Sequence, residues 1–484
     1  MNKNYLILAL LMFSATLFAQ RGELPETLPE YINYAQKNSL AAKAAVSRFE
    51  SRKWQFQAVK SEYLPQLDLM LSGPGLVREI NSITQPDGSE VYRQQSQLFS
   101  YADLGITQKI YPTGGSVSLS SGINRIDILG DEDVYFWQTT PIQMTYSQPL
   151  FQHNDMKWHR KLEEMRFYQS DSKLKEDMED IAIQVTDRFF NVYIAEMNLK
   201  NAEFNVEVND TLFVLSKGRF EVGKIAENDL LQTELSLLNS QNVFENAKLN
   251  YLEAMEQLKI AIGYYGDSDL NIIPPQITMD LYADYEVLLE EALENRSDIT
   301  SYKIEELEAE RAISRAESQS GFSANLNASF GLNQTATQLD DALKDFLDRE
   351  RVNLTLEIPL FDWGQGEARV YSAMEEKNMV QNTITESKKN FEIEIKYASL
   401  RFNQLKQQVK LSAKADTVAA KRYDVAKKRY LIGKIDLNTL FIAQSEKDAA
   451  LRNYIQTLRN YWASFYRLRR LSLYDIIDNK KISY

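Results

Sequence analysis

Two parts of this chain place apolar residues alternately three and four positions apart. One series comprises Phe244, Ala247, Tyr251, Ala254, Leu258 and Ala261, and the other comprises Tyr454, Leu458, Tyr461, Phe465 and Leu468. This spacing puts the apolar side chains on one face of a helix and is typical of coiled-coil packing. The pattern therefore predicts long helices that pack lengthwise, with the aromatic residues in their shared core.

The positions of proline define how far these helices extend. All eleven prolines lie outside residues 150–273 and 360–484, and proline breaks a helix because it lacks a backbone N–H. Glycine is also sparse in both regions, and Gly223 and Gly433 lie near their middles. We therefore expect two helical hairpins that turn at these glycines.

The two arms of the first hairpin differ in length. The arm before the turn has about 70 residues, roughly 100 Å of helix, and the returning arm has about 40. We expect a helix from Tyr285 to Ser320 to cover the rest of this long arm. An N-terminal helix, from about Leu28 to Glu62, is expected to complement the second hairpin in the same way.

Between the helical regions the apolar period changes to two. Alternation is clear in FSANLNASFGL, from Phe322 to Leu332, and it recurs from Val352 to Leu360, from Leu67 to Leu71 and from Ile142 to Tyr146. It predicts strands within 63–150 and 321–361, plus a hairpin-like pair at 101–126. A soluble sheet would alternate in the same way, and whether the added pair joins the main sheet stays open.

Small polar residues on one face and uncharged apolar residues on the other favour the wall of a membrane β-barrel with a wet lumen. About four main strands per chain cannot close a barrel. We therefore expect the barrel to be shared between subunits. The fold class predicted is mixed and mostly α, with a long coiled-coil part and a shared β-barrel.

The N-terminus predicts export. In MNKNYLILALLMFSATLFAQ, Lys3 precedes an apolar run and Ala19 lies near the expected cleavage point, so residues 1–20 are interpreted as a signal peptide. The chain has no cysteine, which excludes disulfides and a lipidated cysteine. Its formal charge of -13, without a Lys/Arg-rich block, argues against nucleic acid as a partner.

No set of residues points to catalysis, a cofactor or a metal. The two histidines, His153 and His159, are six positions apart, so they do not face each other as a helical metal pair would. The carboxylates are spread along helix faces, as is usual for solvated charge. We expect no enzymatic activity, no cofactor and no metal site.

A repeat organises the whole chain. RFEVGKIAENDL, Arg219 to Leu230, returns as RYLIGKIDLNTL, Arg429 to Leu440, 210 residues later, and Pro149-Leu150-Phe151 returns as Pro359-Leu360-Phe361 at the same shift. The sequence therefore predicts two structural repeats, 21–262 and 284–475, joined by a linker at 263–283 and followed by a tail at 476–484.

These features resemble the TolC family of outer-membrane efflux proteins over about residues 26–475. The resemblance is carried by the duplicated order, the YLPQLDL segment, the PLF before each long helix and the R-[FY]-x-[VI]-G turns. It implies a homotrimer whose strands form one barrel in outer-membrane lipid of a Gram-negative bacterium and whose helices form a periplasmic tunnel. It also implies a passive duct for efflux or type I secretion, working with a membrane-fusion adaptor and an inner-membrane pump of RND or ABC type. The alternative is a secreted or surface coiled-coil scaffold or adhesin.

The resemblance further implies that both turns lie at the periplasmic tip, where the adaptor docks. A tight turn needs a residue without Cβ, so the two glycines also have a purely structural explanation. The docking residues implied are Val222, Gly223, Lys224, Ile432, Gly433 and Lys434.

A gate beside the turns is implied in the same way. Asp229 aligns with an acidic residue that latches the closed tip, and Tyr430 aligns with its tyrosine partner. The arginine of that network falls on Ile435, and the two constricting aspartates of the family fall on Thr439 and Ile442. These departures put an acidic ring in doubt, and a hydrophobic constriction at Ile442 is the alternative.

Overall fold

The computed structural model describes residues 24–129, 134–268, 270–275 and 281–484. The expected signal peptide and part of the expected linker lie outside them. The described chain divides into two compact units, each built from both halves of the sequence. The first comprises residues 24–49, 171–296 and 389–484, and the second comprises residues 50–170 and 297–388.

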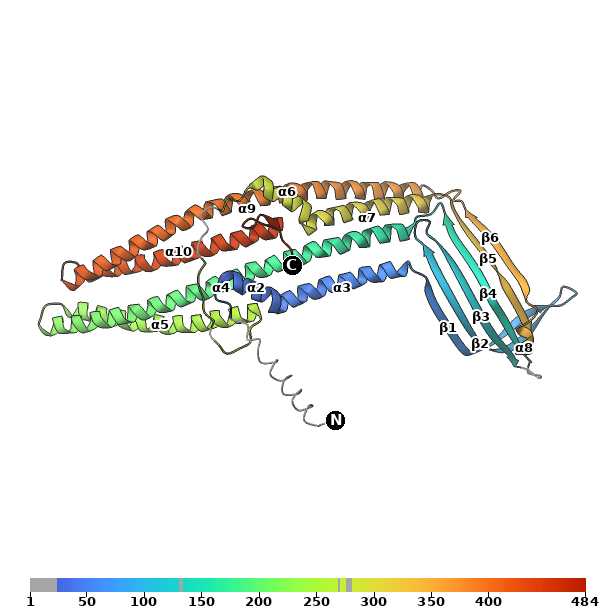
Figure 1. Cartoon of the computed structure of the whole chain (residues 1–484), viewed down its shortest axis with the longest axis horizontal. Helices are drawn as coiled ribbons and strands as arrows, with labels where there is room; N and C mark the ends of the chain where they lie inside the picture. The colour runs from blue at the N-terminus through green and yellow to red at the C-terminus, as the bar shows by residue number, and fades with distance from the viewer. Residues whose placement is uncertain (1–23, 130–133, 269, 276–280) are drawn as a thin grey trace, which may run out of the picture. The chain divides into compact units, whose positions relative to one another are not determined.

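Both helical hairpins are present (Figure 1). The long arms, α4 (Asp155–Glu221) and α9 (Gln365–Leu431), have 67 residues each, and the returning arms, α5 (Glu227–Ile262) and α10 (Leu437–Ser472), have 36 each. Every bound in the second hairpin lies 210 residues after its counterpart in the first. Among the described helices, none has the length and apolar character needed to cross a bilayer.

The two shorter helical regions are each broken where a single helix was expected. The first consists of α2 (Leu28–Asn38) and α3 (Leu40–Glu62), and the second of α6 (Tyr285–Asn295) and α7 (Ser297–Ser320). The residues at the breaks, Ser39 and Arg296, are extended, with ψ of 150° and 145°.

An asparagine ends the first helix of each pair. Asn38 donates to the Tyr34 carbonyl at 3.0 Å, and Asn295 donates to the Glu291 carbonyl at 2.8 Å. Such side-chain bonds satisfy backbone groups that a continuing helix would use. Because the asparagines recur 257 residues apart, the break is a property of the repeat.

The expected assignment of covering helices is confirmed in part: α7 packs on the first long arm, where Leu162 of α4 clusters with Ile304 and Leu307. The short helices follow the opposite assignment, because α2 packs against α5 of the first hairpin and α6 packs against α10 of the second. The linker explains this order. Near its start, Asn271 accepts a hydrogen bond from Tyr31 of α2 at 2.9 Å, and near its end the carbonyl of Ala283 accepts one from Ser399 of α9 at 2.7 Å. The linker thus leads from the first hairpin to the second.

The aromatic stripe of α10 lies in the core of the first unit, as its spacing predicts. Tyr461 and Phe465 are buried, and the Phe402 ring of α9 stacks on Tyr461 with ring centroids 5.0 Å apart. Leu458 and Leu468 are also buried, whereas Tyr454 is half-buried. In the α5 series, Ala247 and Leu258 are buried and the other four residues are half-buried.

The second unit contains one antiparallel sheet in the order β1-β2-β3-β4-β5-β6. Its strands are β1 (Gln66–Thr84), β2 (Glu90–Ile110), β3 (Gly115–Leu129), β4 (Val134–Leu150), β5 (Ser323–Ala336) and β6 (Leu347–Glu357), with the short α8 (Leu339–Ala342) between the last two. The hairpin-like pair is therefore part of the main sheet, as β2 and β3. In the first unit a small ribbon, β7 (Tyr474–Asp475) and β8 (Lys480–Lys481), follows α10.

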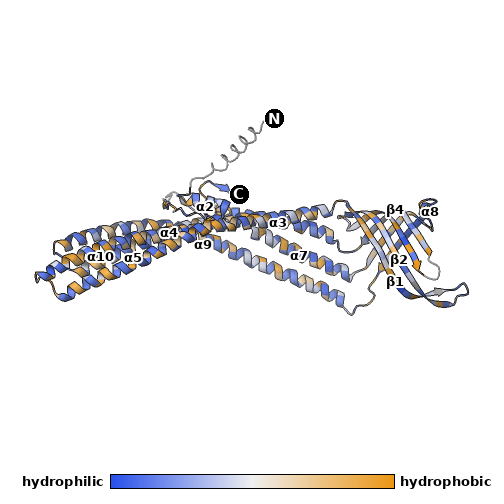
Figure 2. Ribbon diagram, turned by 90° about the horizontal axis from the view of Figure 1, so that it is seen from below, coloured by the Kyte–Doolittle hydropathy of each residue, from blue (hydrophilic) through white to orange (hydrophobic). Residues whose placement is uncertain are grey.

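The strand register sorts the side chains into an apolar and a polar face. Figure 2 shows the resulting alternation of hydropathy along the strands. Across β1 to β5, one row consists of Leu67, Ile106, Leu119, Met144 and Phe330, and it continues to Glu350 on β6. The adjacent row on the opposite face consists of Thr107, Ser118, Thr145 and Ser329. The two-faced sheet expected from the alternation is confirmed.

Helical segments in the second unit pack beside one another at the ends of the strands. Phe56 of α3 stacks on Phe167 of α4 with centroids 4.9 Å apart. On the α7 side, Leu162 of α4 forms a buried cluster with Ile304 and Leu307. These contacts join the helices that precede β1 and β5 to the helix that follows β4.

Candidate functional site: the paired helical turns

The two hairpin turns have the same backbone geometry. Gly223 and Gly433 are left-handed, with φ of 69° and 74°. In the first turn Gly223 N donates to Phe220 O and Lys224 N donates to Arg219 O, both at 2.8 Å, and the second turn repeats these bonds at 2.9 Å. This is the Schellman arrangement, which favours glycine because a Cβ is strained at positive φ.

The residues beside each glycine are exposed. The exposed fraction is 67% for Val222 and 66% for Ile432, and Lys224 and Lys434 are exposed as well. We call these four residues and the two glycines the turn surface. It offers two apolar side chains and two ammonium groups in matching positions.

Contacts from the rest of each hairpin hold the two turns side by side, as Figures 1 and 2 show. The guanidinium of Arg219, at the end of α4, lies 5.7 Å from the ring centroid of Tyr430 in α9. Gln232 of α5 donates to the Asn438 side chain of α10 at 3.4 Å. Within one subunit, the two hairpins are therefore joined next to their turns.

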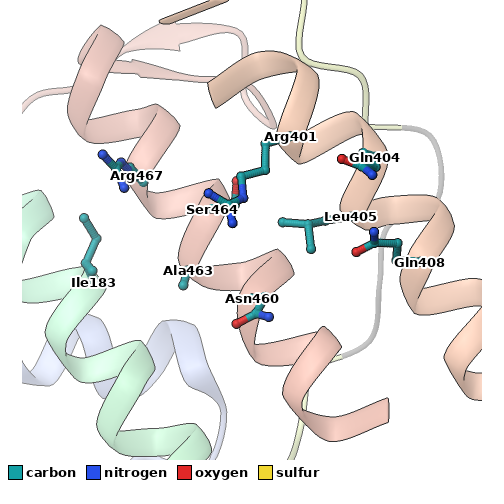
Figure 3. A pocket seen from close by; sticks show the side chains of 9 residues that line it. All are labelled: Ile183, Arg401, Gln404, Leu405, Gln408, Asn460, Ala463, Ser464 and Arg467. Carbon is teal, nitrogen blue, oxygen red and sulfur yellow. The ribbon is translucent and has the colours of Figure 1, made fainter. Parts of the chain in front are cut away.

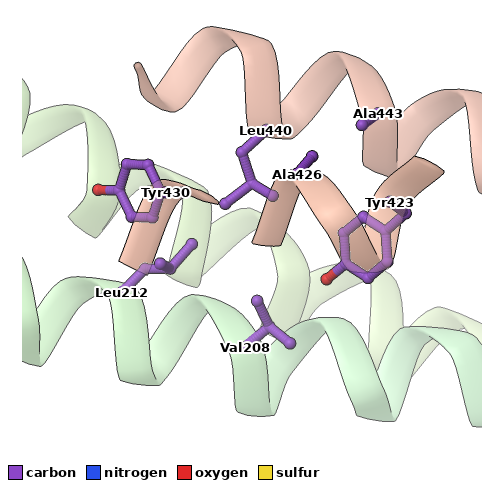
Figure 4. Packing of buried hydrophobic residues seen from close by; sticks show 7 residues of the cluster. All are labelled: Val208, Leu212, Tyr423, Ala426, Tyr430, Leu440 and Ala443. Carbon is purple, nitrogen blue, oxygen red and sulfur yellow. The ribbon is translucent and has the colours of Figure 1, made fainter. Parts of the chain in front are cut away.

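A small hydrophobic cluster supports the turns from behind (Figure 4). It joins α4 to both helices of the second hairpin and comprises Val208, Leu212, Tyr423, Ala426, Tyr430, Leu440 and Ala443. Ile435, Leu437 and Phe441 pack against it. Movement of either turn against the other would disturb this cluster.

The expected gate residues fall into two environments. Tyr430 is 7% exposed within the cluster, whereas Asp229 is exposed in the first turn of α5 and Ile442 is 54% exposed. Among the described residues no hydrogen bond joins Asp229 to Tyr430. A latch between these two residues therefore remains a prediction, and it requires a neighbouring subunit or a rearranged tip.

Thr439 has a structural role that sequence reasoning missed. Its backbone N–H donates to the side chain of Asp436 at 2.7 Å, so Asp436 caps the N-terminus of α10. The hydrogen bond from the Thr439 backbone lowers the pKa of Asp436. The equivalent residue of the first repeat, Ala226, has no side chain that can cap α5. The signal was available, because aspartate is a preferred N-cap residue.

A buried polar group elsewhere in the first unit was also missed. The Glu179 side chain of α4 is fully buried and accepts hydrogen bonds from Arg469 of α10. Arg469 also forms an ion pair with Asp475, and the Tyr484 hydroxyl donates to Glu179 at 2.6 Å. Burial and the nearby charge of Glu179 raise the pKa of Tyr484. No local signal reveals this group, because Glu179 and Arg469 are 290 residues apart.

A hollow of about 600 Å³ lies among α4, α9 and α10 (Figure 3). Its polar lining consists of Arg401, Gln404, Gln408, Asn460, Ser464 and Arg467, and the remaining lining residues are Ile183, Leu405 and Ala463. No carboxylate or imidazole is among these side chains, so the hollow does not have the ligands of a metal or the groups of a general base.

The described residues contain no group of three or more histidine, aspartate or glutamate side chains placed to hold a metal ion. His153 is a packing residue: its side chain is 6% exposed, and its ring nitrogen lies 3.0 Å from the Ser314 hydroxyl. The turns, the hydrophobic cluster and the buried Glu179–Arg469 group are built from helix ends, apolar contacts and hydrogen bonds. Such features suit assembly with other protein segments and movement of one segment against another.

Comparison with solved structures shows the fold. The Campylobacter jejuni CmeC outer membrane channel matches with a TM-score of 0.65 and 18% identity, over 92% of this chain and 85% of that chain. Vibrio cholerae VceC matches at 0.64 and 12%, over 92% and 95%. The open state of the Neisseria gonorrhoeae MtrE channel matches at 0.61 and 14%, over 92% and 88%.

A comparison with curated protein sequences gave no match. The model of the outer membrane efflux protein family matches residues 116–264 and 288–472, which is more than half of the chain and includes both hairpins. The comparisons lend no support to a scaffold or adhesin. The chain belongs to the outer membrane efflux protein family, whose members are channels of the Gram-negative outer membrane.

Proposed function

We propose that this protein is the exit duct of a three-part export system and that its turn surface is where a periplasmic membrane-fusion adaptor docks. Members of the family form trimeric channels that work with adaptors and inner-membrane pumps. The duct itself is passive, and energy comes from a pump of RND or ABC type in an efflux or type I secretion system.

One observation carries the docking proposal: the turn surface is duplicated. Val222-Gly223-Lys224 and Ile432-Gly433-Lys434 share their backbone hydrogen bonds and their exposure. Two turns in each of three chains give six similar sites around a ring. An adaptor with one binding mode could therefore engage both kinds of turn.

The chemistry of the turn surface defines what such a partner must offer. Val222 and Ile432 lose exposed apolar area on docking, which favours binding by about 25 cal/mol for each Å² buried. Lys224 and Lys434 favour carboxylates or backbone carbonyls opposite them. The partner surface should therefore combine small apolar pockets with acceptor groups.

We further propose that the closed tip is held by packing and hydrogen bonds without an acidic ring. The family's aspartate positions hold Thr439 and Ile442 in this chain. Ile442 is 54% exposed in one subunit, so it is available to neighbouring subunits. Three such side chains around the axis would form a hydrophobic constriction, and Asp229 and Tyr430 would supply the latch between adjacent coils.

Crosslinking in cells tests the docking surface. A photo-activated residue is placed at Lys224 or at Lys434, and a matched control is placed at Lys248, which is exposed within α5. We expect positions 224 and 434 to capture a periplasmic adaptor, which also identifies the pump encoded with it. Equal capture at position 248, or no capture at either turn while the trimer is intact, would overturn the docking proposal.

A further inference from the structure

We propose that three copies of this chain close a barrel of 18 strands, because the β2–β3 hairpin is part of the barrel wall and the outer strands pair between copies. Six described strands in each of three copies give this number. Four main strands per chain, as the sequence predicts, would give 12. The proposal rests on the trimer described above and adds the width of its exit.

The hairpin is continuous with the rest of the wall. β2 pairs with β1 from Glu90 to Thr107, and β3 pairs with β4 from Ser116 to Ile128. β1 and β4 have no ladder with each other, so removing the hairpin would leave them unjoined. The wall cannot keep its described hydrogen bonds if β2 and β3 lie elsewhere.

The hairpin is also attached at its helix-side turn. The Asn154 side chain, just before α4, donates to the carbonyl of Tyr111 at 2.8 Å. The guanidinium of Arg160 lies 4.1 Å from the Tyr111 ring centroid. These contacts hold the turn to the same helix that β4 enters.

The two edges of the sheet require a second copy. β1 and β6 each have one side without a partner strand in the described sheet, and unpaired backbone groups are costly in a bilayer. Neighbouring strands alternate in direction, so with an even number of strands β6 of one copy is antiparallel to β1 of the next. The edges can therefore pair in the same way as every other neighbour in the sheet.

The stagger of the strands suits this closure. The row that contains Leu67, one residue after the start of β1, reaches Glu350, seven residues before the end of β6. Both of these strand ends adjoin helices. Measured from the helix side of the sheet, the row therefore rises from one residue to seven, which is six residues over the five spacings between the strands. With a rise of about 3.3 Å per residue and a spacing of about 4.8 Å, the tilt is about 40°, within the roughly 35–45° of membrane barrels.

The faces of the hairpin match those of the wall. Ile106 and Leu119 lie in the apolar row and are each 42% exposed. Leu354 of β6 is exposed on the same face of the sheet. Thr107 and Ser118 lie opposite, in the polar row. The hairpin thus presents an apolar side to lipid and a polar side to the lumen.

The extra strands widen the exit. At this tilt, 18 strands give about 36 Å between opposite strand axes, and 12 strands give about 24 Å. A barrel of this size leaves a water-filled lumen. Bulky hydrated cargo would not be excluded by size at the barrel, so any selection of cargo lies in other parts of the system.

Single cysteines test where the hairpin lies, and the chain has none of its own. Ile106→Cys and Leu119→Cys are labelled with a fluorophore in reconstituted trimers, with Leu354→Cys as the lipid-facing reference and Thr107→Cys and Ser118→Cys as matched neighbours. Brominated lipid should quench positions 106 and 119 to the same extent as 354, and should leave 107 and 118 unquenched. Positions 106 and 119 that stay unquenched while 354 is quenched would overturn the proposal.

Two further measurements use the same trimers. Leu69→Cys combined with Leu354→Cys, or Leu71→Cys combined with Leu354→Cys, should give disulfide-linked trimers, whereas Leu69→Cys with Met144→Cys should not. A β1–β4 disulfide, or a barrel about 24 Å wide in electron micrographs, would contradict 18 strands. These readouts involve no adaptor or cargo, so failure to form trimers sinks the proposed function, and intact trimers with a narrow barrel sink this inference alone.

Discussion

Arg469 donates hydrogen bonds from Nε and Nη2 to Glu179, at 3.1 Å and 2.8 Å, and the Glu179 side chain is fully buried. Burying a carboxylate is costly unless an opposite charge and hydrogen bonds compensate it. Arg469 supplies both, and it also pairs with Asp475 just after α10. This one side chain therefore joins the first hairpin, the second hairpin and the segment that follows.

Arg469→Met should destabilise the protein by about 3–5 kcal/mol, because Glu179 and Asp475 would remain buried without their cation. Unfolding by denaturant, monitored by helical circular dichroism, measures the change. Arg467→Met is the control, because both side chains of the Arg467–Glu394 ion pair are exposed to solvent. Exposed ion pairs contribute about 0–1 kcal/mol to stability. Equal effects of the two substitutions would show that the buried ion pair is not what stabilises this region.

The second prediction concerns Gly433. No atom lies within 4 Å of the position that a Cβ would occupy, so a substitution acts through backbone strain at φ of 74° without a clash. Gly433→Val should cost at least about 1–2 kcal/mol. It should also abolish adaptor crosslinking at Lys434, while the chain is still secreted.

Gly218 offers a matched control for this prediction. It lies inside α4, with no atom within 4 Å of its Cβ position and without a positive φ. Gly218→Ala should therefore stabilise the helix by about 0.5–1 kcal/mol, whereas Gly433→Ala should destabilise the turn. Unchanged crosslinking in Gly433→Val trimers would argue against a docking role for that turn.

The two hairpins and their repetition were predictable from the sequence. The proline-free regions predict the hairpins, and Gly223 and Gly433, which recur at the same shift of 210 residues as Arg219 and Arg429, mark their turns. The breaks at Ser39 and Arg296 were missed because no proline or glycine marks them and the asparagine bonds are local. The order of the covering helices and the Glu179–Arg469 pair depend on tertiary contacts, which single-sequence periodicity does not contain. Burial of Tyr430 was hidden for the same reason.

Tyr430→Phe separates the two roles of Tyr430. The ring should stay in the hydrophobic cluster, so stability should change little, whereas Tyr430→Ala should cost about 3–5 kcal/mol. If the hydroxyl is part of the latch, Tyr430→Phe raises the leak conductance of the closed channel in planar bilayers. Asp229→Asn should act in the same direction, and the double variant should add little. A leak that stays at the wild-type level in Tyr430→Phe would eliminate this latch.

The cap at Asp436 makes the two turns unequal. Asp436→Ala should increase hydrogen exchange at the Thr439 amide, whereas Asp436→Asn should largely preserve the cap. Because the folded-state pKa of Asp436 is lowered, its stabilising effect is present above the unfolded pKa and is lost as the pH falls through the folded pKa. Ala226→Asp should add an equivalent cap to α5 and slow exchange there. Faster exchange in Ala226→Asp would contradict the equivalence of the two positions.

Tyr461 predicts how stability depends on alkaline pH. Its side chain is fully buried, its hydroxyl has no hydrogen-bond partner among the described residues, and burial raises its pKa to about 12. An unfolded tyrosine loses its proton at about pH 10. Between these two pKa values the folded state binds more protons than the unfolded state, so the stabilisation present below about pH 10 is lost as the pH rises through about 12.

Tyr461→Phe removes this titration and keeps the ring that stacks on Phe402. We expect its stability to fall less steeply between about pH 10 and 12. At neutral pH its stability should be unchanged or higher by up to about 1–3 kcal/mol, because an unpaired buried hydroxyl is lost. Denaturant unfolding over a pH series measures both effects, and Tyr397→Phe, at a 66% exposed site in α9, is the control. A Tyr461→Phe trimer that is less stable at neutral pH would show that a neighbouring subunit bonds this hydroxyl, and would contradict the prediction.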